Sequence, residues 1–139
     1  MTTTDFALDP RLTADTQHVA SLPLCEVLLM NDTRFPWLVL VPRQTNRVEI
    51  CDLAPEQQAV LWQEVKRSAD ALRAVAPFDK LNLGALGNIV RQLHVHVVGR
   101  TDGDAAWPGP VWGSGKALPY EPAAQAQQIQ ALRRALGVD

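Results

Sequence analysis

The chain has 139 residues, of which 47% are hydrophobic and 20% are charged, and its formal net charge is −2. This composition is that of a globular protein, and the length suits one domain over residues 1–139. No run of Lys or Arg supplies the basic surface that a nucleic-acid polymer needs, so we exclude that class of partner.

The N-terminus and the cysteines indicate in which cellular compartment the protein is expected. Residues 1–5 lack the basic and apolar regions of a signal peptide, and the longest apolar run, residues 37–41, is too short to cross a bilayer. We therefore expect a cytoplasmic protein that does not bind a membrane. Cys25 and Cys51 stand without His or Cys at metal-ligand spacing, which predicts free thiols and no zinc site.

Two hydrophobic runs, residues 24–30 and 37–41, predict neighbouring antiparallel strands. The segment between them, residues 31–36, is polar and begins with turn-forming residues. It places Asn31 at the end of the first strand, where a side chain can point into a site.

A long helix is predicted over residues 55–74. Pro55 suits its first turn, Glu56 favours the positive end of the helix dipole, and Pro77 ends it. Apolar residues then recur at helical spacing and form a core-facing stripe: Leu61, Val65, Ala69 and Leu72.

The second half of the chain adds two strands, a long loop and a helix. Strands are expected at 80–84 and 92–100, separated by a loop at 85–91. Residues 101–120 contain four Gly, three Pro and two Trp and form a loop, and residues 121–136 form a helix with Ile129, Leu132 and Leu136 on one side. We therefore predict an α+β fold, with an antiparallel sheet of about five strands, its helices on one face, and a core within residues 5–100.

The strand at 92–100 carries the chemistry. Side chains alternate across a strand, so Gln92, His94 and His96 are expected on one face. The opposite face is aliphatic, with Leu93, Val95 and Val97, and belongs in the core. The polar face must then open to a cleft or to solvent.

From the pattern alone the two histidines allow three interpretations: surface residues without a role, two metal ligands, or a nucleophile with a helper. The metal interpretation needs a third ligand, and His18 has no nearby carboxylate that marks it as one. The loop before the strand contains two glycines and Asn88, so its N–H groups can meet an anion or can simply form a turn.

Residues 87–98, Gly-Asn-Ile-Val-Arg-Gln-Leu-His-Val-His-Val-Val, resemble the signature of the histidine triad (HIT) family, in which three histidines alternate with apolar residues after a Gly-containing loop. Residues 28–31 and 38–42 are similar to the family's ribose-contacting strand and the strand that follows. The resemblance covers roughly residues 20–100. Gln92 departs from it, because it stands where the first histidine of the triad would be.

The resemblance implies that His94 attacks the α-phosphorus of a nucleotide and is transiently nucleotidylated, after which water releases the mononucleotide. It assigns His96, Asn88 and N–H groups near Gly87 to the phosphoryl oxygens, and Asn31 to the ribose, although Asn31 can equally be a turn former. The implied substrates are dinucleoside polyphosphates or nucleoside phosphoramidates. The implied enzyme is a homodimer that needs neither metal nor cofactor.

Two alternatives remain open. Gln92 cannot titrate, which favours a nucleotide-binding sensor or adaptor without turnover, and a metal-dependent enzyme with His94 and His96 as ligands is the third hypothesis. In the loop at 101–120, Trp112 either forms an aromatic wall for a substrate base or pins the loop to the body. Asn82, on the neighbouring strand, is a further candidate to face the cleft.

Overall fold

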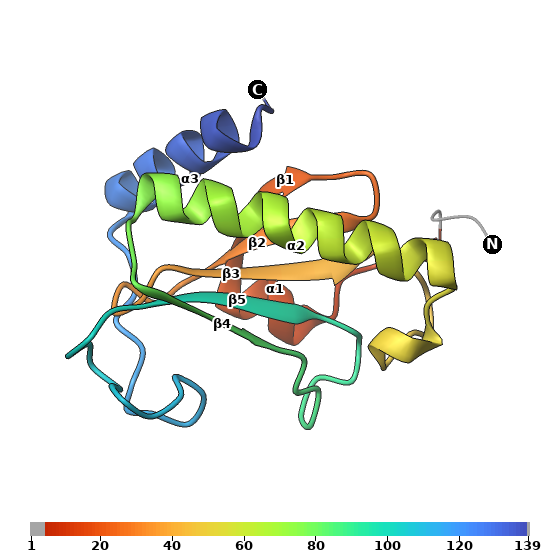
Figure 1. The fold of residues 1–139 in the computed structure, drawn as a ribbon, viewed down its shortest axis with the longest axis horizontal. Coiled ribbons are helices and arrows are strands. Elements are labelled where there is room, and N and C mark those ends of the chain that lie inside the picture. Colours follow the sequence, from red (N-terminus) through yellow and green to blue (C-terminus); the bar gives the residue numbers. More distant parts are fainter. Residues whose placement is uncertain (1–4, 139) are drawn as a thin grey trace.

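The computed structural model describes residues 5–138. Within this range five strands form one antiparallel sheet in the order β1-β2-β3-β5-β4 (Figure 1). The strands are β1 (Thr16–Ser21), β2 (Cys25–Met30), β3 (Trp37–Pro42), β4 (Lys80–Gly84) and β5 (Val95–Arg100). The predicted α+β fold with about five antiparallel strands is confirmed.

The helices are α1 (Pro10–Asp15), the 3-10 helix η2 (Ile50–Asp52), α2 (Pro55–Val75) and α3 (Pro122–Leu136). The bounds of α2 and α3 confirm the helices expected at 55–74 and 121–136 to within one residue. Pro55 occupies the first turn of α2, with Glu56 beside it. No helix in the range 5–138 is long and apolar enough to cross a membrane.

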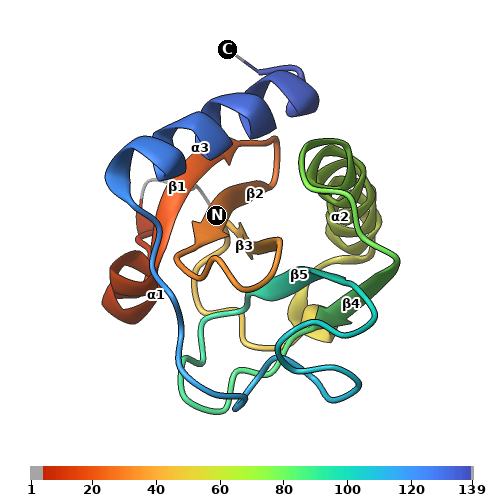
Figure 2. The same cartoon turned by 90° about the vertical axis from the view of Figure 1, so that its left-hand side faces the viewer.

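The larger core lies between the sheet and the pair α2 and α3 (Figure 2). It holds the predicted aliphatic face of the last strand, Leu93, Val95 and Val97, which are at most 3% exposed. The predicted stripe of α2 packs against it: Leu61, Val65, Ala69 and Leu72. Burial of these apolar surfaces fixes which face of β5 is left for the histidines.

A second core covers the opposite face of the sheet, where the sequence led us to expect no helix. The short α1 lies here and contributes Leu12, and the loop after β5 contributes Val111. The expectation that all helices lie on one face is therefore wrong for α1. Both faces of the sheet are therefore packed against other elements.

The strand expected at 92–100 begins only at Val95. The chain bends before it, because the Leu93 N–H donates to the carbonyl of Arg47 (2.9 Å) and the Gln92 side chain bonds the N-terminal segment. His94 thus lies just before the strand and His96 lies within it.

The loop after β5 is tethered at its start by a buried guanidinium. Arg100 donates two hydrogen bonds of 2.8 Å to the carboxylate of Asp104 and one of 3.0 Å to Oδ1 of Asn82. Its guanidinium also stacks on Phe35 and Trp107. Asn82 therefore binds Arg100 and does not line the cleft, which corrects its expected placement.

Candidate active site

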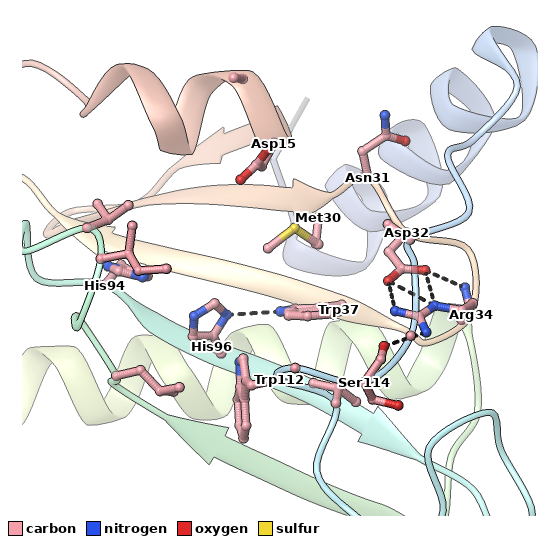
Figure 3. A pocket seen from close by; sticks show the side chains of 18 of the residues that line it. Asp15, Met30, Asn31, Asp32, Arg34, Trp37, His94, His96, Trp112 and Ser114 are labelled. Atoms are coloured by element: carbon pink, nitrogen blue, oxygen red, sulfur yellow. Dashed lines mark hydrogen bonds and ion pairs between the residues drawn. The ribbon is translucent and has the colours of Figure 1, made fainter.

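A cavity of about 810 Å³ opens on the face of the sheet that α1 covers (Figure 3). This volume falls in the range of small-molecule sites. Its walls come from the end of α1, the β2–β3 turn, the loop at 86–90, the histidine segment and the segment 111–119. Of the seven residues expected in a site, six line it: Asn31, Gly87, Asn88, His94, His96 and Trp112.

His94 is held with one ring nitrogen free. It is 6% exposed, and its Nδ1 lies 2.7 Å from the backbone carbonyl of Gln92. A carbonyl only accepts, so Nδ1 carries the proton and donates it. In the neutral ring the other nitrogen, Nε2, then carries the lone pair, which is the state a nucleophilic imidazole requires.

His96 is held in the opposite tautomer. Its Nδ1 accepts a hydrogen bond of 3.0 Å from the indole Nε1–H of Trp37, so its ring proton is on Nε2. Burial, reinforced by the neighbouring His94 ring, lowers the pKa of His96 to about 4. The two ring centroids are 5.0 Å apart, so an electron-pair donor and an N–H donor stand side by side.

Two tryptophans flank His96. The ring of Trp37 lies 5.7 Å from it and the ring of Trp112 lies 5.5 Å from it, centroid to centroid (Figure 3). Trp112 packs so closely on β4 that a Cβ added to Gly84 would lie 2.9 Å from the indole. The Nε1 atom of Trp112 is buried and has no hydrogen-bond partner among the described residues. Leaving such a donor unpaired is costly, so this indole is held in place by packing and not by a hydrogen bond.

The far end of the cavity is built by a buried ion pair that the sequence did not reveal. Asp32 and Arg34 form a bidentate pair, with Nη2 to Oδ2 at 2.8 Å and Nε to Oδ1 at 3.0 Å. Burial opposes ionisation of Asp32, but the hydrogen bonds from Arg34 outweigh it and lower the pKa of this carboxyl. Arg34 also donates to the carbonyl of Ser114 (2.8 Å), and Asp32 accepts from the N–H of Leu118 (3.3 Å).

This pair and Asn31 fasten the segment 111–119 over the cavity. Oδ1 of Asn31 accepts from the N–H of Tyr120 (2.8 Å), and the Asn31 N–H donates to the carbonyl of Asp15 (3.0 Å). Asn31 thus joins β2, α1 and the loop, and its side chain still lines the cavity. The partners in the loop lie 80 to 89 positions away along the chain, so no local pattern could have predicted them.

Gln92 does not line the cavity. Its Oε1 accepts from the N–H of Asp9 and its Nε2 donates to the carbonyl of Ala7, both at 2.8 Å. The expectation that Gln92 shares a face with the two histidines is wrong, because the bend before β5 turns it toward the N-terminal segment. Only its backbone carbonyl reaches His94.

No group of three His, Cys, Asp or Glu side chains in residues 5–138 is placed to hold a metal ion. His18, the remaining histidine, is on β1, where its Nε2 lies 2.6 Å from Oε1 of Glu26. It takes no part in the cavity.

Comparisons with known proteins agree on one family. The model of the HIT domain matches residues 11–103. A histidine triad protein from Sinorhizobium meliloti 1021 is 45% identical, with a TM-score of 0.93 over 96% of this chain and 99% of that chain. One from Bradyrhizobium japonicum is 47% identical (TM-score 0.91; 94% and 98% covered), and one from Marinobacter aquaeolei VT8 is 44% identical (TM-score 0.91; 95% and 96% covered). No curated protein matches the sequence.

Proposed function

The chain belongs to the histidine triad family, and from that premise we propose that it is a nucleotidyl hydrolase or transferase with His94 as its nucleophile. The substrate is a nucleoside 5′-phosphate derivative, cleaved at the α-phosphorus. The observation that carries the proposal is the pair of opposite tautomers, with a lone pair on Nε2 of His94 beside an N–H on His96.

The proposed reaction has two displacements at phosphorus. Nε2 of His94 attacks and the leaving group departs, and water then cleaves the nucleotidyl-histidine. Charge on the phosphoryl oxygens is met by preorganised donors: the Nε2–H of His96, the amide of Asn88, and N–H groups beside Gly87, whose positive φ of 68° shapes the loop.

The nucleoside is assigned to the end of the cavity near α1 and the β2–β3 turn. The amide NH₂ of Asn31 is the group for a ribose hydroxyl, since its Oδ1 is already used by Tyr120. Trp112 contributes an aromatic wall, and its contact with Gly84 also pins the loop, so the two roles first considered for it coexist.

The test is to incubate the purified protein with a dinucleoside polyphosphate and with a nucleoside phosphoramidate, and to measure nucleotide release and the mass of a trapped adduct. We expect an adduct on His94 that His94→Gln abolishes. The matched control is His18→Gln, on a surface strand, which should leave the adduct intact. A protein that binds AMP but gives neither release nor adduct would show the catalytic proposal to be wrong.

A second candidate is a nucleotide-binding sensor or adaptor. The observation that favours it is the placement of Gln92, which leaves the cavity without the outer group of the triad. This candidate predicts AMP binding at the same cavity, lost in Asn31→Ala, with no chemistry on any nucleotide. Calorimetry beside the adduct measurement separates the two functions.

We also propose that the protein is a homodimer. The edge strand β4 and the loop that follows it carry three exposed apolar residues, Leu83, Leu86 and Ile89, at 41%, 44% and 77% exposure. Such a patch beside an unpaired strand edge suits a protein interface. Light scattering should give twice the chain mass for the wild type and the single mass for Leu83→Glu. A monomeric wild type would contradict the proposal.

A further inference from the structure

The hydrogen bond between Trp37 and His96 determines which ring nitrogen of His96 carries the proton. An indole N–H can only donate, so Nδ1 of His96 stays unprotonated for as long as the 3.0 Å bond persists. Both side chains are 7% exposed, so water competes poorly for this bond. Their strands, β3 and β5, are direct neighbours in the sheet, with Val39 opposite His96, which holds the two rings on a rigid support.

A neutral imidazole that donates from Nε2 is a hydrogen-bond donor and not an acid. It can stabilise an anionic oxygen, but to transfer its proton it would have to become an imidazolate. Acting as an acid requires the doubly protonated ring, and both the Trp37 bond and the lowered pKa of His96 oppose that form. His96 is therefore unable to protonate a leaving group at neutral pH.

The other charged or titratable side chains that line the cavity among the described residues do not supply that proton. Asp32 and Arg34 are engaged with each other, and a guanidinium does not give up its proton in proteins. Asp15 is exposed, and a carboxylate offers only acceptors. His94 is consumed as the nucleophile, and Gln92 faces away.

We propose that Trp37 is a positioning residue that fixes His96 as a permanent hydrogen-bond donor, so that the site acts on nucleotides whose leaving group departs as a stable anion. The inference rests on the proposed function and narrows its substrates. Acid anhydrides of a nucleotide, such as dinucleoside polyphosphates, fit this requirement. Phosphoramidates of alkylamines do not, because an amine leaves only after it has gained a proton.

The proposed reaction needs no proton from an acidic group of the protein. The Nε2 lone pair of His94 forms the N–P bond while the bond from phosphorus to the leaving atom breaks, and that atom keeps the electron pair. Water then attacks phosphorus, the N–P bond breaks, and its electrons return to Nε2. The water proton passes to bulk solvent, so His96 keeps its own proton throughout.

The first experiment measures the tautomers directly, by long-range ¹H–¹⁵N NMR of the histidine rings between pH 5 and 8. In the wild type we expect His96 to be protonated at Nε2 only, without titrating. In Trp37→Phe we expect His96 to titrate or to populate the Nδ1–H form. Trp62→Phe, on the exposed side of α2, is the matched control and should match the wild type. A wild-type His96 that is protonated at Nδ1, or that titrates near pH 6.5, overturns the role of Trp37 whether or not the variant folds.

The second experiment measures the dependence on the leaving group in the first turnover of the wild type. With a series of substituted phenyl esters of AMP, the rate should fall about tenfold for each unit of increase in the phenol pKa. AMP alkylphosphoramidates should react at least a hundredfold more slowly than a dinucleoside polyphosphate. Equal rates for these two substrates overturn the leaving-group assignment. If no substrate gives an adduct, the proposed function and the leaving-group assignment fail together, and the NMR spectra still decide the role of Trp37.

Discussion

At the scale of single residues, burial couples His96 to stability as well as to chemistry. In the unfolded chain a histidine titrates near 6.5, whereas in the folded protein the pKa of His96 is about 4. Between these values the unfolded state binds more protons, so the free energy of unfolding should fall as the pH drops from 6.5 to 4. The upper bound from this one group is about 3 kcal/mol.

Urea denaturation at pH 7 and at pH 4.5 tests this prediction. In His96→Asn the difference in unfolding free energy between the two pH values should shrink, whereas His18→Asn, at an exposed position, should keep it. An unchanged difference in His96→Asn would mean that other groups cause the acid sensitivity.

Gln92 has acquired a different role from the one its place in the motif suggested. Because its side chain bonds residues 7 and 9, replacing it with His brings no imidazole into the cavity. We therefore expect Gln92→His to leave nucleotide turnover no higher than in the wild type, and Gln92→Ala to cost about 1 kcal/mol of stability for the lost hydrogen bonds. First-turnover kinetics and urea denaturation measure the two effects. A rise in activity in Gln92→His would show that this side chain can reach the substrate.

At the scale of elements, the loop after β5 depends on the buried guanidinium of Arg100. Asp104→Asn removes the charge that neutralises it, and an uncompensated buried charge costs about 3 kcal/mol. The pair is suited to this test because Arg100 is 2% exposed and the Asp104 side chain is 11% exposed. Chemical denaturation should show the loss, whereas Asp70→Asn, which breaks an exposed pair with Lys66, should cost about 0.5 kcal/mol at most. Equal effects in the two variants would contradict the tether.

Most of the elements that the sequence predicted have a strong local pattern of apolar residues, and β4 is the exception, because none of its residues is buried. α2 and α3 carry apolar stripes, β3 and β5 are continuous runs of buried residues, and β2 buries four of its six residues. α1 and β1 were not predicted, because α1 has six residues with one buried side chain, Leu12, and β1 buries only Val19 and Ala20. Such short elements are fixed by tertiary contacts that no local window contains.

In the site, too, the residues that belong to a local motif were predictable from the sequence, and those held by distant partners were not. The histidines, Asn31 and the loop at Gly87 stand at motif positions, and the structure brings them to one cavity. The bend at Gln92 depends on partners 83 and 85 positions earlier in the chain. The pairing of Asp32 and Arg34 with the segment 114–118 is equally non-local. Long-range hydrogen bonds of this kind leave no pattern in the sequence.

At the scale of the whole molecule, we propose that the chain folds as one domain. α3 packs on α2 and β1, and Arg133 and Arg67 tie it down through carbonyls of Val19 and Leu136. Fluorescence of the four tryptophans, two of which line the cavity, and circular dichroism of the helices should then report one common unfolding transition. Leu132→Ala, on the buried face of α3, should lower the midpoint of this transition in both probes and cost about 3 kcal/mol.

Leu118→Ala, at a side chain that is 56% exposed, is the control for this truncation and should change the midpoint little. Two separated transitions, or a shift in only one probe for Leu132→Ala, would indicate that α3 unfolds as an independent unit.

The two hydrogen bonds between the Gln92 side chain and residues 7 and 9 also affect how this protein can be prepared. Gln92 binds the N-terminal segment with its side chain and orients His94 with its backbone carbonyl. The position of the nucleophile is therefore coupled to the N-terminal segment. A bulky affinity tag fused close to Asp5, or a protease that trims the segment through Asp9, would loosen that support and disturb the imidazole. A tag placed after α3 leaves these contacts intact. Comparing nucleotide turnover in the two preparations would show whether a change at the N-terminus is enough to abolish the activity of the site.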